Sequence, residues 1–296
     1  MTLLEVSDLT VRFGRGRPAV DAVSFILEPG QRLGLIGESG SGKTLTALAV
    51  MGLLPDAARF DGSVLLNQTP MLTAPDRRAS QLRGAVVSMV FQEPMSALDP
   101  TMMVGRQLAE VVRLHASGER RVRPRDPVGG AADGGISSTR ARVLRMLTEV
   151  ELPDPARIAA SYPHQLSGGQ RQRAMLAMAM INNPDLIICD EPTTALDVTV
   201  QARVLRLLGR TLDDHGTACL FISHDLAVVA QVCDQVMVML DGRIVELGST
   251  DEVFGNPQHA YTRGLVAASR LDLIEVGQRL PTIDDVIGDR VDHDWS

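Results

Sequence analysis

Eight consecutive residues, Gly37 to Thr44, have the types and the spacing of a loop that binds phosphate. They fit the pattern G-x-x-x-x-G-K-[ST] and lie between a short apolar strand and an amphipathic helix. Glycines in such a loop let backbone N–H groups turn toward phosphate oxygens, and the helix N-terminus adds a partial positive charge. We expect a nucleotide to be contacted by Gly37, Glu38, Ser39, Gly40, Ser41, Gly42, Lys43 and Thr44.

Lys43 is the only lysine in a chain that has 29 Lys and Arg residues. A lysine ammonium is a compact charge on a flexible stem and can reach β- and γ-phosphates, whereas the arginine guanidinium is a wider planar fork. We interpret Lys43 as a position where arginine cannot serve. The alternative is a genome bias toward arginine that left one lysine in the motif by chance.

Two acidic residues, Asp190 and Glu191, follow the apolar run at 186–189. Ligands bind at the carboxyl edge of an open α/β sheet, so both carboxylates are expected beside the phosphate loop. There Asp190, through water, and the Thr44 hydroxyl would hold Mg²⁺, and Glu191 would polarise the water that attacks the γ-phosphate. The sequence therefore predicts hydrolysis at a γ-phosphate with Mg²⁺ as cofactor, a chemistry that many phosphate-loop proteins share.

A pentapeptide between these two motifs narrows the choice among phosphate-loop proteins. Ser167 can cap the helix that follows it, and two glycines leave the first N–H groups of that helix uncovered, as a second anion site would require. The alternative is a plain capped helix with glycine in its first turn. The pentapeptide resembles the signature of the nucleotide-binding subunits of ABC transporters: Leu166, Ser167, Gly168, Gly169 and Gln170.

The resemblance runs in order along nearly the whole chain to about residue 270, and it implies roles for four more residues. Phe13 stands where the family has an aromatic residue that stacks on adenine, although the family more often has Tyr there and a core Phe is the alternative. Gln92 matches a glutamine that contacts the metal or water. Asp197 matches a residue at the dimer interface, and His224 matches a histidine that contacts the γ-phosphate.

Four segments resemble the peptide and nickel importers within this family. They are residues 91–100, 162–165, 195–202 and 256–262. The first, the second and the last are expected to lie outside the phosphate site and to reflect the membrane partner. Two features depart from the family pattern: residues 117–138 resemble an insertion, and no Cys follows Cys233, so we expect no metal cluster in the tail.

Short apolar runs alternate with helical patterns, which predicts an α/β fold with a parallel sheet. Strands are expected at 32–36, 86–91, 186–189, 218–223 and 235–240, and helices at 45–54, 198–212 and 226–232. Helices at 102–115, 139–151 and 167–181 form an inserted helical subdomain at about 93–183. Together with the resemblance, this pattern of strands and helices predicts a P-loop NTPase core of the ABC type. The core is expected to have a mainly parallel sheet and an N-terminal antiparallel β subdomain.

The expected ATP-binding domain spans 1–255, with a mobile insertion at about 117–138, and a short extension with a flexible tail spans 256–296. The composition fits a globular protein: 296 residues, 45% hydrophobic and 22% charged. A net charge of −7 disfavours a nucleic-acid partner, since that role needs a basic surface. Three cysteines without C-x-x-C spacing are expected to be reduced, and no apolar run is long enough to span a membrane.

Together the motifs predict the ATP-hydrolysing subunit of an ABC importer, most plausibly for di- or oligopeptides. The implied partners are a second ATPase subunit, of the same or a related chain, two membrane permease subunits and, indirectly, an extracytoplasmic substrate-binding protein. The expected location is the cytoplasmic face of the cell membrane, held there through the permeases. The alternatives are an importer of nickel or a metal chelate, an exporter subunit, and an ATPase of DNA repair or translation.

Overall fold

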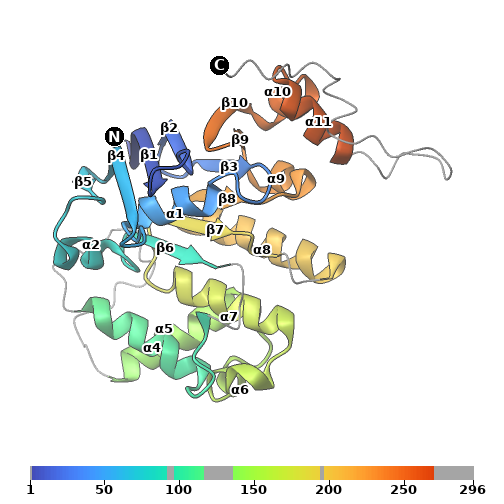
Figure 1. The fold of residues 1–296 in the computed structure, drawn as a ribbon. Coiled ribbons are helices and arrows are strands. Elements are labelled where there is room, and N and C mark those ends of the chain that lie inside the picture. The colour runs from blue at the N-terminus through green and yellow to red at the C-terminus, as the bar shows by residue number, and fades with distance from the viewer. Residues whose placement is uncertain (1, 92–96, 117–135, 194–196, 270–296) are drawn as a thin grey trace, which may run out of the picture.

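The computed structural model describes residues 2–91, 97–116, 136–193 and 197–269 (Figure 1). Several predictions fall on residues outside these ranges. They concern Gln92 and residues 117–135, 194–196 and 270–296. The described residues form two sheets and an inserted group of helices. This arrangement confirms the predicted α/β architecture, including the antiparallel β subdomain at the N-terminus.

The larger sheet has six strands in the order β10-β9-β3-β8-β7-β6. The pairings from β6 to β9 are parallel, and β10 pairs antiparallel with β9. The strands are β3 (Arg32–Ile36), β6 (Val87–Val90), β7 (Leu186–Asp190), β8 (Ala218–Ile222), β9 (Gln235–Leu240) and β10 (Arg243–Ser249). The predicted mainly parallel sheet is therefore present, and its core strands are buried on both faces.

The smaller sheet is antiparallel, in the order β2-β1-β4-β5. Its strands are β1 (Leu4–Phe13), β2 (Val20–Leu27), β4 (Ala58–Leu66) and β5 (Thr69–Pro70). The predicted N-terminal antiparallel β subdomain is this sheet, but β4 was not expected as one of its strands. Residues 59–62 of β4 are exposed, so this strand lacks the alternation of buried and exposed residues that predicts strands.

The helix α1 (Lys43–Met51) begins within the phosphate loop and lies between the two sheets (Figure 1). Side chains of the large sheet alternate between its faces. Leu33, Leu35 and Ile188 join the cluster beneath α1 and the small sheet, whereas Ile187 and Phe221 join the cluster on the other face. The α1 helix ends at Gly52, which has a left-handed conformation and returns its N–H to Ala49 and Leu48.

The inserted helical subdomain contains α4 (Val104–Ala116), α5 (Ile136–Glu149), α6 (Pro155–Ala159) and α7 (Gly168–Met180). They gather below the large sheet in Figure 1. The helix α5 begins three residues earlier than predicted, so residues 136–138 are helical instead of belonging to the expected insertion. Two glycines, Gly134 and Gly135, directly precede it, and no Gly or Pro interrupts the residues that follow.

The remaining helices are α2 (Asp76–Leu82), α8 (Val198–His215), α9 (Leu226–Val232), α10 (Thr250–Gly255) and α11 (Ala260–Ser269). No sequence pattern predicted α10 or α11. The helix α11 packs into the main core through Tyr261 and Val266. Within the described part of the chain, no helix combines the length and apolarity needed to cross a membrane.

Candidate functional site

The phosphate loop joins the end of β3 to the start of α1, and its backbone is very tightly packed. Gly37 and Gly42 have positive φ values of 154° and 106°. A Cβ at Gly37 would lie 2.2 Å from the Met239 carbonyl oxygen, and one at Gly42 would lie 2.5 Å from that of Ala19. Both conformation and space therefore require glycine at these two positions.

Lys43 lies inside this loop and is only 6% exposed. Its Nζ donates hydrogen bonds to the carbonyl oxygens of Gly37 at 2.8 Å and Glu38 at 2.7 Å. Burial lowers the pKa of the ammonium, while the negative charges of Glu191, Asp190 and Glu38 act in the opposite direction. Lys43 is thus a buried cation whose present partners are neutral carbonyls, and an anion would be a stronger partner.

Asp190 and Glu191 lie at the carboxyl end of β7. Asp190 is 6% exposed; burial raises its pKa, and a hydrogen bond from the Thr44 side chain opposes that change. Glu191 has a φ of 47°, a left-handed conformation that costs a residue with a side chain about 1–3 kcal/mol. Its backbone N–H donates to Ile222 O at 2.9 Å, which fixes the strained residue against β8.

His224 lies two residues after the end of β8 and faces Glu191. Its Nδ1 is 3.2 Å from Glu191 Oε1, and its side chain is 58% exposed. The two residues meet because β7 and β8 are parallel neighbours, with Asp190 paired to Ile222. One carboxylate and one imidazole therefore stand together at the sheet edge that also carries the phosphate loop.

The donors present fit a polyphosphate. Among the described residues, Ser41 Oγ is one of the buried polar atoms without a hydrogen-bond partner. A Cβ at Gly40 would have nothing within 4 Å, so the loop is open at that point. A buried hydroxyl and a buried ammonium beside an open stretch of glycine backbone are suited to anionic oxygens.

The side-chain oxygens at this edge also fit a magnesium ion that is coordinated by both the protein and the phosphate. Thr44 and Asp190 supply two oxygen donors in contact with each other. No group of three His, Cys, Asp or Glu residues that could hold a metal occurs in the described ranges. Mg²⁺ commonly takes one or two protein oxygens and completes its shell with water and phosphate oxygens.

The pentapeptide 166–170 forms the start of α7, with a reciprocal cap. Ser167 Oγ accepts from the Gln170 N–H at 3.3 Å, and the Gln170 side chain accepts from the Ser167 N–H at 3.0 Å. The predicted cap is therefore present. Gly169 has a second role that the sequence did not reveal, because a Cβ there would lie 2.7 Å from Val200 Cγ1 at the start of α8.

Asp197 and Phe13 are exposed at the ends of their elements. Asp197 caps α8 by accepting from Val200 N at 3.0 Å, and the next residue, Val198, is 80% exposed. Phe13 ends β1 and is 43% exposed, so it is not a fully buried core residue. Gln92 and residues 194–196 lie outside the described ranges, so their predicted roles stay predictions.

The structure shows one contact with the phosphate loop that the sequence did not predict. Tyr261 of α11 accepts a hydrogen bond from the Glu38 N–H at 3.0 Å. The expectation that the whole segment 256–262 lies outside the phosphate site is therefore wrong. The two residues are 223 positions apart, and no local pattern in either segment indicates the contact.

A sequence model described as ABC transporter matches residues 20–194. The chain is 47% identical over 271 residues to the peptidoglycan transport ATP-binding protein YejF of Agrobacterium fabrum, covering 90% of this chain and 47% of that protein. It is 45% identical over 276 residues to the oligopeptide transport ATP-binding protein OppD of Salmonella typhimurium, covering 91% and 77%. The chain thus spans about half the length of the first relative and about three quarters of the second.

The fold is also similar to a solved structure, a dimeric post-hydrolysis state of the ATP-binding cassette MJ0796 bound to ADP and Pi. The TM-score is 0.68 at 25% sequence identity, and the match covers 83% of this chain and 98% of that one.

The contact between Gly169 and Val200 generates a prediction about how the two helix starts are held together. We expect Gly169→Ala to lower the free energy of unfolding by about 1–3 kcal/mol, because its methyl group would overlap the stiff Val200 side chain. The double variant Gly169→Ala/Val200→Ala should recover most of that loss in thermal or urea unfolding. Equal losses in the single and double variants would contradict the contact as the cause.

Proposed function

Because this chain belongs to the ABC transporter family, we propose that it is the ATP-hydrolysing subunit of an importer. The observation that carries the proposal is the pair formed by Glu191 and His224, 3.2 Å apart, at the sheet edge that bears the phosphate loop. A carboxylate to polarise water, an imidazole and a buried ammonium are the groups that γ-phosphate hydrolysis needs.

In this proposal Lys43 changes partners when ATP binds. Its ammonium leaves the carbonyl oxygens of Gly37 and Glu38 for the β- and γ-phosphates. Backbone N–H groups of residues 37–44 and the hydroxyl of Ser41 complete the cradle, and Phe13 stacks on the adenine. The buried ammonium stabilises the charge that develops on the phosphate oxygens during hydrolysis.

Glu191 orients and polarises the attacking water, and His224 contacts the γ-phosphate. The strained backbone of Glu191 supports this role, because such conformations concentrate at functional sites. Thr44, Asp190 and Gln92 are the residues that would hold Mg²⁺, which neutralises phosphate charge when it is bound. The contact between Thr44 and Asp190 supports two members of that set.

We propose that two such subunits bind ATP between them, with the signature of one facing the phosphate loop of the other. The reciprocal cap of Ser167 and Gln170 fixes the start of α7, and the N–H groups of Gly168 and Gly169 in its first turn then face the γ-phosphate. Asp197 lies at the interface, which the exposure of the neighbouring Val198 supports. Binding of ATP would favour the closed pair, and hydrolysis would reopen it.

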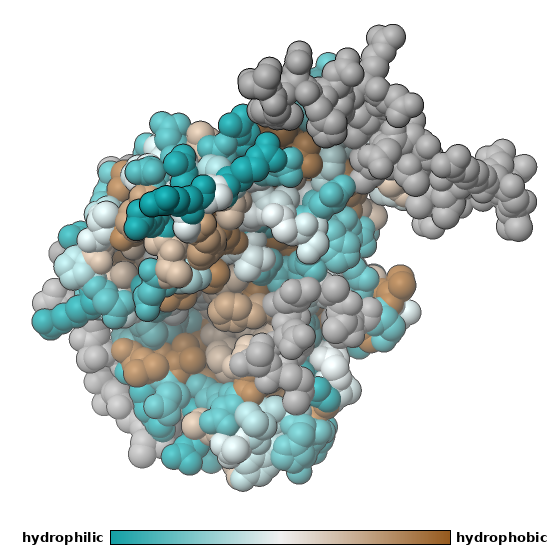
Figure 2. All heavy atoms as spheres, viewed as in Figure 1, coloured by the Kyte–Doolittle hydropathy of each residue, from teal (hydrophilic) through white to brown (hydrophobic). Residues whose placement is uncertain are grey.

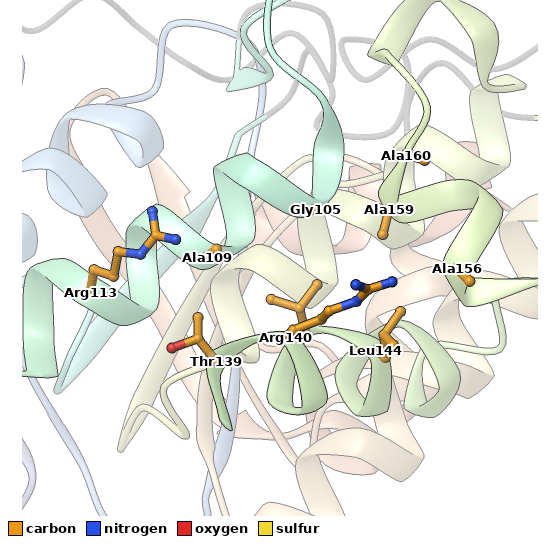
Figure 3. Close-up of a pocket in the computed structure, with 10 residues that line it drawn as sticks. Gly105, Ala109, Arg113, Thr139, Arg140, Leu144, Ala156, Ala159 and Ala160 are labelled. Atoms are coloured by element: carbon orange, nitrogen blue, oxygen red, sulfur yellow. The ribbon is translucent and has the colours of Figure 1, made fainter. Parts of the chain in front are cut away.

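A groove in the helical subdomain supports permease partners (Figure 3). It lies between α4, α5 and α6, and its volume is about 240 Å³. Small side chains would let a short cytoplasmic helix of a permease approach closely, and Arg140 extends along the groove while Arg113 lies toward its other end. The residues concerned are Gly105, Ala109, Ala156, Ala159, Arg113 and Arg140.

The described residues on the face drawn in Figure 2 form no broad apolar patch. Figure 2 shows a largely hydrophilic face, with apolar side chains gathered mainly in the recessed band between its upper and lower parts. We place the subunit at the cytoplasmic side of the membrane, held by two permeases, with an extracytoplasmic binding protein as an indirect partner.

Peptides are the proposed cargo. The two relatives are an oligopeptide and a peptidoglycan transport ATP-binding protein. Nickel or a metal chelate is the second candidate, because segments 91–100 and 256–262 resemble both kinds of importer.

Glu191→Gln tests the proposed hydrolysis. The amide cannot accept a proton, so we expect ATP binding to persist and turnover in the assembled complex to fall by about 10²–10⁴-fold. Steady-state ATPase assays and ATP-binding titrations measure the two effects, with Glu28→Gln, a matched change at an exposed position, as the control. Full turnover by Glu191→Gln would remove Glu191 from the proposed role.

Lys43→Arg tests whether the lone lysine is needed for its shape and not only for its charge. We expect nucleotide affinity to fall at least about tenfold, because charge-assisted hydrogen bonds contribute roughly 1.5–3 kcal/mol and the wider guanidinium cannot reproduce them. Arg206→Lys, on an exposed face of α8, is the control for exchanging these residue types. Parent-like affinity in Lys43→Arg would favour the alternative of a lysine retained by chance.

The cargo is tested in cells that lack this subunit. We expect the loss of uptake of labelled di- or oligopeptides, restored by the parent chain but not by Glu191→Gln, and recovery of two permeases with the tagged subunit. Normal peptide uptake with lost nickel uptake would replace the cargo and keep the transporter. Recovery of ribosomes or DNA without any permease would contradict both.

A further inference from the structure

The C-terminal helix α11 reaches back to the phosphate loop through one side chain. We propose that Tyr261 is a positioning residue of this loop, whose hydroxyl holds the Glu38 peptide group in the shape that receives the nucleotide. The inference rests on the proposed function of the loop as the ATP site. Tyr261 is 3% exposed, and its hydroxyl lies 3.0 Å from the Glu38 nitrogen.

Glu38 is held through both of its backbone polar groups. Its N–H donates to Tyr261, and its carbonyl oxygen accepts from Lys43 Nζ at 2.7 Å. The second bond is the one that Lys43 gives up when it moves to a phosphate. The bond to Tyr261 does not depend on the ammonium, so it keeps Glu38 in place while Lys43 changes partners.

The neighbouring residue Gly37 is confined on another side. A Cβ there would lie 2.2 Å from the Met239 carbonyl oxygen, so β9 lies directly against the first residue of the loop. With Tyr261 bonded to the next residue, the entry to the loop is braced by two separate elements. Such a preorganised loop loses less conformational entropy when it binds a ligand.

Tyr261 is itself held in place by the segment that precedes α11. The Tyr261 N–H donates to His259 Nδ1 at 3.2 Å. The Glu246 carboxylate accepts from the N–H groups of Gln258 at 2.8 Å and His259 at 3.0 Å. Glu246 belongs to β10, which pairs with β9, which pairs with β3. Tyr261 and the phosphate loop are therefore attached to the same sheet.

The phenol keeps its proton at neutral pH. Burial raises the pKa of Tyr261 above its ordinary value, although the hydrogen bond from the Glu38 amide acts in the opposite direction. The contact is therefore between a neutral hydroxyl and an amide. Tyr261 adds no negative charge that would repel incoming phosphates. This charge state suits a group that supports an anion site from behind.

Tyr261→Phe tests the proposal, because phenylalanine fills the same space without the hydroxyl. We expect the affinity for Mg–ATP to fall roughly two- to twelve-fold, as the loss of one net hydrogen bond would produce. The apparent KM for ATP should rise by a similar factor in the assembled complex, with kcat changed less than about twofold, since the hydroxyl does not touch the reacting atoms. Amide hydrogen exchange at Glu38 should accelerate in the isolated chain.

The matched control is Tyr162→Phe, the same change at the only other tyrosine of the chain, which lies in the helical subdomain. It should leave ATP affinity and Glu38 exchange unchanged. Unchanged affinity and unchanged Glu38 exchange in Tyr261→Phe would overturn the proposal. So would a large fall in melting temperature with unchanged Glu38 exchange, because the phenol would then serve core packing alone.

The two proposals can fail separately. If the parent chain binds no ATP, the proposed function fails, while exchange at Glu38 still decides whether Tyr261 holds that amide. If the parent binds ATP and Tyr261→Phe binds it equally well with an unchanged KM, the positioning role fails and the proposed function stands.

Discussion

The parallel pairing of β3, β8 and β7 is the constraint on which the rest of the site depends. Leu35 lies opposite Ile222, and Ile222 lies opposite Asp190, so these strands end at the same level. The residues that follow each strand therefore meet at one edge, although the chain separates Lys43 from His224 by about 180 positions. This register sets where the charged groups of the candidate site meet, and a slip of one residue in β7 would turn the Asp190 side chain to the other face of the sheet.

Backbone conformation, more than side-chain packing, determines the shape of the loop at this edge. Gly37 and Gly42 combine positive φ values with contacts that leave no room for a Cβ. Glu191 adopts a left-handed conformation despite its side chain, and the hydrogen bond to Ile222 O stabilises it. The sheet edge thus stabilises a local strain that brings the carboxylate to His224, as expected where function and stability compete.

Two polar junctions add to the apolar packing between the core and the surrounding elements, and they differ in strength. At the first, the Glu151 carboxylate pairs with Arg203 and Arg210 of α8, while its carbonyl oxygen accepts from Arg173 of α7. These ion pairs are exposed and contribute at most about 1 kcal/mol each. At the second junction, α11 is fixed by a buried tyrosine and a hydrogen-bonded segment, so it is the firmer attachment of the two.

The sequence by itself determined the phosphate loop, the acidic pair at the end of β7, the cap of α7 and the central strands, of which β3 and β9 have the predicted bounds. These features are local: each depends on periodicity, capping or glycine spacing within about ten residues. It did not predict β4, β10 or α11: the first half of β4 is exposed, β10 is partly buried with no alternation, and α11 has no strong apolar periodicity. Only the tertiary structure decided that Tyr261 contacts Glu38 and that Val200 requires glycine at position 169. Both contacts join residues distant in the chain, and their existence depends on how the elements pack and not on any local preference.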